Sequence, residues 1–232
     1  MEAVGITERR DREQKVPSPS YRRIQDLIRD DIVGGRLTPN LHLKTADLAK
    51  HYGVSANPIR EALQRLEGEG LVIILPNRGA RVREIDEPFL RNILDILLLL
   101  DPYFVRWFVE SARTADIAEL DAIQRRLDKA AKRDDFTAFH LENGLFHGAI
   151  YRHHFNSEAL RIVNLHNDLL RTLSCRYPAN QTRMLQSSTE HRAIIQAARA
   201  SDAETAVRAT RTHIERSNAY ILRLLRADRS HA

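Results

Sequence analysis

Polar side chains interrupt the apolar stripes of three predicted helices in the second half of the chain: Asn143, His147, His191 and His213. Asn143 and His147 are four residues apart, so they share one helix face, and that face is the apolar one. His191 and His213 lie on the apolar faces of two later helices. Three imidazoles and one amide are therefore expected to point toward the same interior.

Neutral imidazoles are ligands for Zn, Ni, Co, Fe and Mn. A single inward histidine is usually a hydrogen-bonded core residue, but three of them favour a shared site for a divalent metal ion. The predicted ligands are Asn143, His147, His191 and His213. Three histidines leave coordination positions open, and their spacing does not name the metal, for which Zn, Ni and Mn are the leading types. The other histidines here lack this pattern and are predicted to be surface or packing residues: His140, His153, His154 and His166.

Long helical periodicity from Glu87 onward must position these side chains. The pattern predicts an all-α antiparallel bundle over residues 87–232. Its helices are expected at 88–111, 115–133, 135–153, 157–176, 183–200 and 202–227. Three residues are the expected N-caps of helices in this bundle: Asp135, Ser157 and Ser201.

Residues 18–86 show short helical and strand patterns broken by glycine and proline, and they predict a small winged domain. A flexible arm over residues 1–17 is expected to precede it. A helix is expected from about residue 18 or 20 to Gly34-Gly35. Two short helices follow, at 45–51 and 57–67, separated by Gly53. Two strands, at 71–75 and 80–83, form a hairpin around Pro76-Asn77-Arg78-Gly79. The fold class is therefore mainly α, with an N-terminal winged helix-turn-helix.

The second helix of this pair begins with polar residues of the types that reach phosphates and base edges in a major groove. We expect seven residues of the winged domain to contact double-stranded DNA: Lys44, Thr45, Ser55, Asn57, Arg60, Arg78 and Gly79. Arg78 and Gly79 lie at the hairpin tip, which can reach the backbone or the neighbouring minor groove. An amphipathic helix pair alone is a weak signal, but the adjacent hairpin strengthens it.

Composition agrees with a folded, DNA-binding protein but does not locate the DNA-binding part. Of the 232 residues 43% are hydrophobic and 29% are charged, and the net charge is +5. The first 86 residues contribute +2 of it (15 basic, 13 acidic) and the remainder +3 (21 basic, 18 acidic). The longest apolar run, Ile96 to Leu100, is far below the ~20 residues of a membrane span, and a single cysteine excludes an internal disulfide. We therefore predict a cytoplasmic protein with no membrane association.

The stretch GVSANPIREALQRLEGEGLV, from Gly53 to Val72, resembles the GntR family of regulators, and the likeness extends over about residues 21–82. The resemblance implies that Arg60 is a principal DNA contact, with Ser55 and Asn57 beside it. Many members carry an acidic residue and an arginine where this chain has Thr45 and Ala46, and an arginine at Ala56. We expect Lys44 and Asn57 to compensate in part, and the operator to differ from common ones.

Residues 89–225 resemble the FCD effector domain of one large GntR subfamily. The motifs that carry this likeness are NGLFH (Asn143 to His147), Asn156, EHRAII (Glu190 to Ile195) and RTHI (Arg211 to Ile214). The resemblance implies a metal-containing pocket for a small organic acid. Many such domains have Asp at the position of Asn143, and an arginine at that of Leu97. Without that arginine, Arg171 or Arg176 is expected to bind the carboxylate of the effector.

Two other functions remain open at this point. A three-histidine site could serve a metal-dependent hydrolase, although the chain contains no H-E-x-x-H, G-x-S-x-G or Gly-rich phosphate loop. Alternatively, the bundle could serve only to dimerise a structural DNA-binding protein that has no effector. We expect a regulator rather than an enzyme, acting as a homodimer because a symmetric pair reads a two-fold operator.

Overall fold

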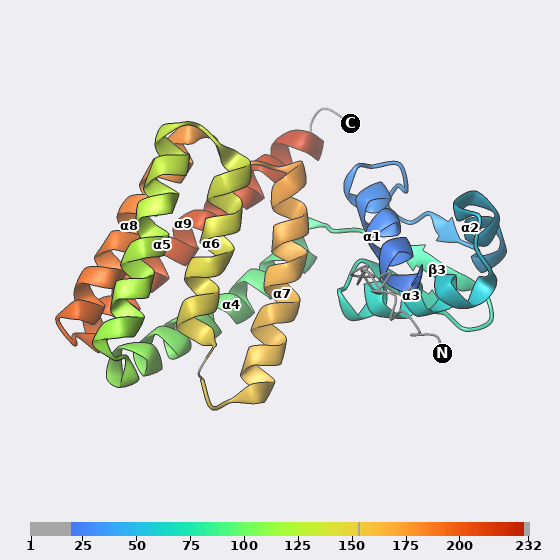
Figure 1. The fold of residues 1–232 in the computed structure, drawn as a ribbon. Coiled ribbons are helices and arrows are strands. Elements are labelled where there is room, and N and C mark those ends of the chain that lie inside the picture. Colours follow the sequence, from blue (N-terminus) through green and yellow to red (C-terminus); the bar gives the residue numbers. More distant parts are fainter. Residues whose placement is uncertain (1–19, 153, 230–232) are drawn as a thin grey trace, which may run out of the picture.

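The structure is a computed structural model, and it describes residues 20–152 and 154–229. The described chain forms two domains joined by one short linker (Figure 1). The predicted arm over residues 1–17 and the predicted packing residue His153 lie outside the described residues. Helix α4 begins at Glu87, where the sequence places the boundary between the domains.

The N-terminal domain packs three helices against a small sheet. The helices are α1 (Ser20–Val33), α2 (Thr45–Tyr52) and α3 (Ala56–Gly68), and the strands are β1 (His42–Leu43), β2 (Val72–Leu75) and β3 (Gly79–Val82). The antiparallel sheet has the order β1-β3-β2. Buried side chains spaced by four on α1, such as Ile24 and Ile28, pack against Ile59 and Leu63 of α3. The predicted helix-turn-helix and hairpin are therefore confirmed, whereas β1 was not predicted.

The hairpin turn depends on Gly79, which adopts a left-handed backbone with φ of +89°. A Cβ atom at this position would lie 2.2 Å from the backbone oxygen of Leu43 in the neighbouring strand. That backbone oxygen cannot rotate away as the end of a side chain would. The close approach of β1 to β3 therefore requires glycine here.

Replacing Gly79 with alanine is expected to destabilise the N-terminal domain by at least about 2 kcal/mol, because it combines a positive φ with a backbone clash. Urea unfolding followed by circular dichroism measures the loss. Gly68→Ala is the matched control, since its added Cβ meets nothing within 4 Å. Equal unfolding midpoints for the two variants would contradict this account of the wing.

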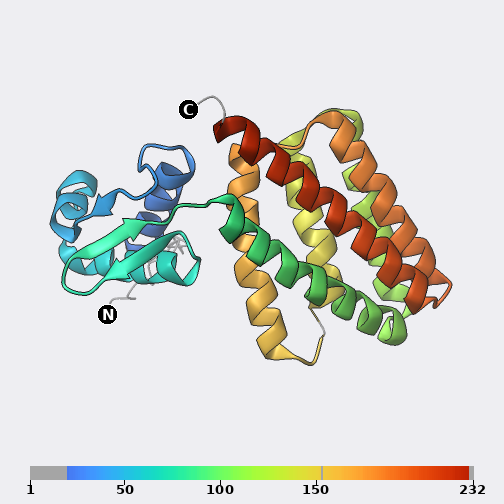
Figure 2. The ribbon, with the colours of Figure 1, turned by 180° about the vertical axis from the view of Figure 1, so that it is seen from behind.

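The C-terminal domain is a bundle of long helices. They are α4 (Glu87–Ser111), α5 (Thr114–Lys132), α6 (Phe136–Tyr151), α7 (Ser157–Arg176), α8 (Gln181–Arg199) and α9 (Ala203–Arg229). Figure 2 shows α4 and α9 crossing the back of the bundle side by side. Within the described residues, no helix combines the length and apolar character that crossing a membrane requires.

The helix starts confirm one predicted N-cap and correct two. The Asp135 carboxylate accepts a hydrogen bond from the backbone N–H of Ala138, as expected. The predictions of Ser157 and Ser201 as caps were wrong. Asn156 caps α7, and Asp202 accepts a hydrogen bond from the third residue of α9, Thr205. Ser157 is already the first helical residue of α7, and Ser201 has φ of +54° and lies two residues before α9. Neither serine therefore occupies the N-cap position, where the free N–H groups can be reached.

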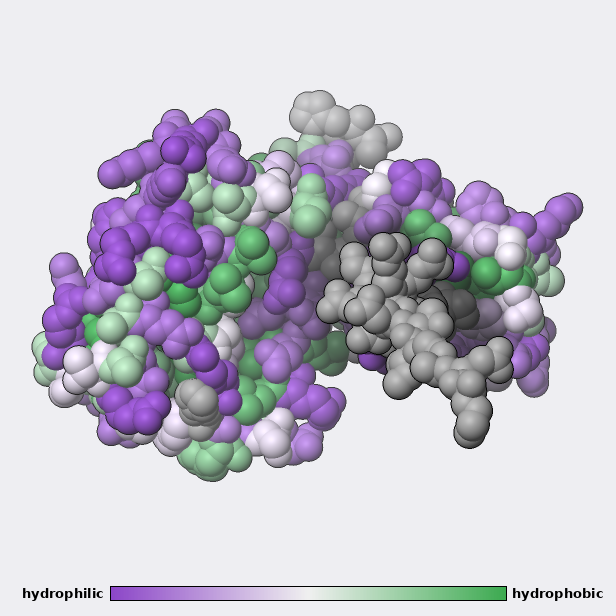
Figure 3. Space-filling view, in the orientation of Figure 1, coloured by the Kyte–Doolittle hydropathy of each residue, from purple (hydrophilic) through white to green (hydrophobic). Residues whose placement is uncertain are grey.

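The exposed surface is mostly hydrophilic on the face that Figure 3 shows, with hydrophobic side chains gathered over α5 and α6. Leu141 and Leu145 of α6 are among the large exposed apolar residues. A second group of exposed apolar side chains involves α4 and the turn after α6: Ile96, Leu99, Tyr103 and Phe155.

Candidate metal centre and nucleic-acid interface

The exposed start of α3 presents the polar residues that the sequence analysis selected. Ser55 occupies the N-cap position, and Asn57 and Arg60 lie exposed in the first turns. The Asn57 amide oxygen accepts a hydrogen bond from an Nη atom of Arg60 at 3.3 Å. This bond aligns the two side chains on one exposed face of the recognition helix.

The remaining predicted DNA contacts surround that helix start. Lys44 is exposed directly before α2, and Thr45 is half-buried as its first residue. Arg78 is exposed at the hairpin tip, where its backbone oxygen contacts the His42 ring. Sequence reasoning missed Arg81, an exposed residue of β3 that stands opposite His42 in the antiparallel pairing with β1. Its signal was alternation, because Arg81 stands between the buried Ala80 and Val82.

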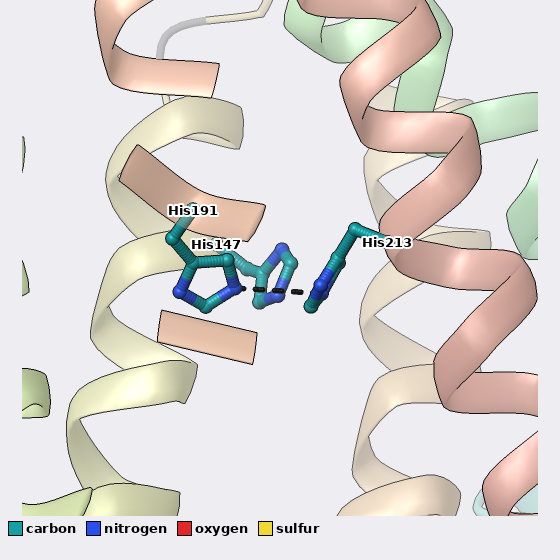
Figure 4. A group of neighbouring side chains, drawn as sticks. All are labelled: His147, His191 and His213. Carbon is teal, nitrogen blue, oxygen red and sulfur yellow. Dashed lines mark hydrogen bonds between the residues drawn. The ribbon is translucent and has the colours of Figure 1, made fainter. Parts of the chain in front are cut away.

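Three helices bring His147, His191 and His213 together in the bundle (Figure 4). One ring nitrogen of each histidine lies within 4.8 Å of the corresponding atoms of the other two. The Nε2 atoms of His191 and His213 are 3.4 Å apart. Two nitrogens on a tetrahedral zinc ion lie roughly 3.4 Å apart, given Zn–N bonds of about 2.0–2.1 Å. The His191–His213 pair therefore has the spacing of two ligands on one divalent ion, and a nitrogen of His147 lies within 4.8 Å of both.

The Nδ1 atoms of two of these rings have hydrogen-bond partners, a carboxylate for His213 and a tyrosine hydroxyl for His147. His213 Nδ1 lies 2.8 Å from Oε2 of Glu190. His147 Nδ1 lies 3.2 Å from the hydroxyl of Tyr151, and that hydroxyl donates to Asp101. Both arrangements place the ring proton on Nδ1 and leave the Nε2 lone pair available. Metal-ligating histidines are usually oriented by partners of this kind.

His191 is positioned by packing rather than by a hydrogen bond on its far side. Its ring stacks on Phe146, with centroids 4.1 Å apart and planes 9° from parallel. Its Nδ1 atom is buried and has no partner among the described residues. This ring therefore has a fixed plane, and its Nε2 is directed at the Nε2 of His213.

Burial keeps His147 and His191 in the neutral form that a metal needs. It lowers the pKa of His147 to about 3, with a further contribution from His213. Burial also lowers the pKa of His191 well below its usual value. Burial acts to raise the pKa of Glu190, but hydrogen bonds from His213 and Arg183 outweigh it and lower that pKa to about 2. The site thus combines two neutral imidazoles, those of His147 and His191, with the ionised carboxylate of Glu190.

A cavity of about 290 Å³ opens onto this cluster. His147, His213 and the predicted ligand Asn143 line it, together with Arg171. The Arg171 side chain is 56% exposed, which places it at the mouth. A Cβ at Gly144 would lie 4.0 Å from Nη2 of Arg171. The cavity thus combines the histidine cluster with a cation that remains accessible to solvent.

Arg176 does not line this cavity, although the sequence analysis selected it beside Arg171. Five residues of helix turn the chain by about 140° beyond a full turn, so the two arginines of α7 face different directions. The Arg176 guanidinium instead bonds to Asp228 of α9 at 2.9 Å.

Sequence reasoning missed Arg183, a buried cation in the wall of the cavity. Its guanidinium donates to both oxygens of Glu190, at 3.1 and 3.0 Å, and to the Ser217 hydroxyl at 2.7 Å. Its sequence signal was weak, because the helix was expected to begin at this residue. Arg183 holds the carboxylate that in turn orients His213.

Asp101 is the other missed residue, and its signal was visible. It stands four residues after Leu97 and three before Phe104, on the buried stripe of α4. The side chain is 6% exposed and lines the cavity. Burial raises the pKa of Asp101 to about 7, despite the hydrogen bond from Tyr151.

This pKa predicts a pH-dependent difference between the wild type and Asp101→Asn. The folded protein binds the Asp101 proton more tightly than the unfolded chain, whose pKa is 3.8. The free energy of unfolding of the wild type, relative to the variant, should therefore rise by about 1 kcal/mol for each unit that the pH falls from 7 to 5. Urea unfolding at these pH values measures it. The difference should stay constant between pH 8 and 9, and a flat profile below pH 7 would contradict the prediction.

Comparisons with known proteins agree with both halves of this geometry. The family model of bacterial regulatory proteins of the gntR family matches residues 20–82, and the FCD domain model matches residues 92–216, more than half of the chain. The chain is 30% identical to the HTH-type transcriptional regulator McbR of Escherichia coli, over 55% of this chain and 58% of that protein. It is 24% identical to the galactonate operon transcriptional repressor of E. coli, over 84% of this chain and 93% of that one.

The solved structure of E. coli McbR/YncC has a similar fold. Its TM-score is 0.67 at 22% identity, and the match covers 88% of this chain and 98% of that one. The two matched ranges follow the order of the two domains, residues 20–82 in the N-terminal one and residues 92–216 in the C-terminal one. The chain therefore belongs to the GntR family of bacterial regulatory proteins, in the subfamily that carries an FCD domain.

Proposed function

We propose that this protein is a DNA-binding transcription regulator whose affinity for its operator is controlled by a small organic acid, bound beside a divalent metal in the cavity of the C-terminal domain. The observation that carries the proposal is the histidine cluster, which opens into a cavity with an accessible arginine. The named relatives are transcriptional regulators, including repressors of gluconate and galactonate operons.

The metal would be held by His147, His191 and His213, with Asn143 as a fourth, neutral ligand from the turn preceding His147. A bound divalent ion supplies positive charge and an open coordination position for an anionic group. Glu190 and Tyr151 keep the ring protons of two histidines on Nδ1. The protein thereby holds the cluster in the protonation state that binds metal without further rearrangement of those two rings.

Arg171 is the residue that we expect to bind the carboxylate of the effector. Its nearest acidic partner, Asp168, is 3.5 Å away in an exposed pair, and such pairs contribute little. The guanidinium is therefore available to a ligand that enters the cavity. A volume near 290 Å³ is at the small end of ligand sites, which favours an acid of a few carbons.

The signal would reach the DNA-binding domain through Tyr177, at the end of α7. This residue lines the effector cavity and also a groove of about 480 Å³ between the two domains. Its hydroxyl donates to Asp228 of α9 at 2.7 Å, on the same oxygen that Arg176 contacts. A ligand that moves Tyr177 changes the packing of α7 and α9 against the winged domain, which couples the two sites.

A homodimer would place two recognition helices on one two-fold operator. The exposed apolar side chains of α4, together with Phe155 in the turn after α6, support this assembly. Leu99 is 68% exposed and Phe155 72% exposed in the single chain, and isolated soluble domains rarely leave such a group uncovered.

The test is a screen of small carboxylates by thermal shift, with and without Zn, Ni or Mn, followed by DNA mobility shift. DNA for the second step comes from in vitro selection with the purified protein. We expect at least one acid to raise the melting temperature only when metal is present, and to change the affinity for the selected DNA. Turnover of the acid would indicate a hydrolase instead. Selected DNA that responds to no acid would indicate a structural DNA-binding dimer.

A further inference from the structure

The floor of the effector cavity contains a carboxylate with an unused oxygen. Asp101 lines this cavity from α4, between Leu97 and Phe104 on the buried stripe of that helix. The Tyr151 hydroxyl donates to its carboxylate. The Oδ1 atom is buried and has no hydrogen-bond partner among the described residues.

Leaving such an atom without a partner is costly, and native proteins rarely do so without a functional reason. Asp101 is only 6% exposed, so its buried neighbours, Tyr151 among them, restrict the orientation of the carboxylate. Asp101 is therefore a preorganised hydrogen-bond acceptor within the cavity.

Neither cation of the cavity pairs with Asp101. The Arg183 guanidinium is occupied by Glu190 and Ser217. Arg171 lies at the mouth, and its nearest acidic neighbour is Asp168. The cations and the histidine cluster of the cavity therefore suit an acidic group, whereas the free oxygen of Asp101 suits a hydrogen-bond donor.

We propose that Asp101 accepts a hydrogen bond from a hydroxyl or ammonium group of the effector, so that the ligand is a small hydroxy or amino acid rather than a plain mono- or dicarboxylic acid. This inference rests on the proposed function, in that an acid must first bind in the cavity. Asp101 is then the residue that determines specificity, and Arg171 and the histidine cluster provide general affinity for acids.

Calorimetric titration of the zinc-loaded protein tests this with matched acids. Propionate, succinate and hexanoate lack a donor; lactate, malate and gluconate add hydroxyls; alanine and aspartate add an ammonium group to the first two. For at least one set, we expect the wild type to bind a donor-bearing acid about tenfold or more tighter than its plain counterpart, as a charge-assisted hydrogen bond would give.

Two variants distinguish a preference caused by Asp101 from one caused by the metal, because a metal ion can itself favour 2-hydroxy acids by chelation. Asp101 accepts from Tyr151, which orients His147, so both variants are titrated at zinc concentrations that elemental analysis shows to saturate them. In Asp101→Leu the preference should fall below about threefold. In Asp101→Asn the amide can still form a hydrogen bond with a hydroxyl, which both donates and accepts, so a preference for hydroxyl should persist. A preference for ammonium should be lost, because the negative charge is gone. The Asn variant keeps the shape of the side chain and decides the question if the Leu variant does not fold.

Three results would overturn the inference: equal binding within every set by the wild type, a hydroxyl preference that survives Asp101→Leu, or an ammonium preference that survives Asp101→Asn. Failure of the proposed function looks different. In that case no acid of any kind, plain or donor-bearing, binds to the wild type or changes its affinity for DNA.

Discussion

Replacing His191 with alanine is expected to lower the affinity for a divalent metal by at least about 100-fold. The variant removes one of three imidazoles from a site whose geometry depends on all of them, and even the loss of an outer partner of a ligand typically costs 10–100-fold. Competition with a chelator of known affinity measures the dissociation constant, and elemental analysis after dialysis measures the metal content.

Two further variants make this result specific to the cluster. Glu190→Gln removes the charge that orients His213 and should cost about tenfold or more in metal affinity. His166→Ala removes a histidine of α7 that does not line the cavity and should leave the metal content unchanged. Since His191 is fully buried, His147→Ala provides a second ligand variant whose circular dichroism can be compared with that of the wild type. Full metal occupancy in both alanine variants at stoichiometric metal would refute the site.

Replacing Arg60 with alanine is expected to lower the affinity for selected operator DNA by about 10–100-fold. A bidentate contact between arginine and a base edge is worth about 1–3 kcal/mol, and the Asn57 bond helps to hold the Arg60 side chain in place before DNA binds. Mobility shifts at matched ionic strength measure the change, because affinity for DNA depends strongly on salt.

The control for this variant is Arg125→Ala. Arg125 is exposed on α5, so the variant loses the same charge in the C-terminal domain, far along the chain from the recognition helix. We expect its affinity for the operator to equal that of the wild type. If Arg60→Ala were no weaker than Arg125→Ala, the assignment of α3 as the base-reading helix would be wrong.

Much of the fold could be predicted because local patterns determine it. The apolar period of three to four residues predicted each helix to within about two residues at either end, and Gly79 identified the turn of the hairpin. Strand β1 has only two residues, so it has no alternation to detect. Its existence depends on pairing with β3, which is a long-range contact that no local pattern records.

The residues of the candidate site also differ in whether a local sequence pattern could reveal them. His147, His191 and His213 could be selected because each interrupts an apolar stripe on its own helix. The role of Glu190 could not be predicted in this way, since it meets His213 only when α8 and α9 pack together. Tyr151 lies four residues after His147 on the same helix, but its contact with Asp101 depends on packing against α4. Asp101 shows where a local signal was present but unused: a carboxylate on the buried stripe of α4 is as informative as a buried histidine.

Because Tyr177 lines two separate pockets, a synthetic compound could act on this regulator at a second place. Tyr177 lines both the cavity at the histidine cluster and the groove between the domains. That groove is lined largely by apolar side chains, such as Ile32, Leu37 and Leu173. An apolar compound designed for the groove would act on the same tyrosine without resembling an acid or competing for the metal. Under the proposed mechanism, an acid in the cavity and an apolar compound in the groove would both change DNA affinity through Tyr177.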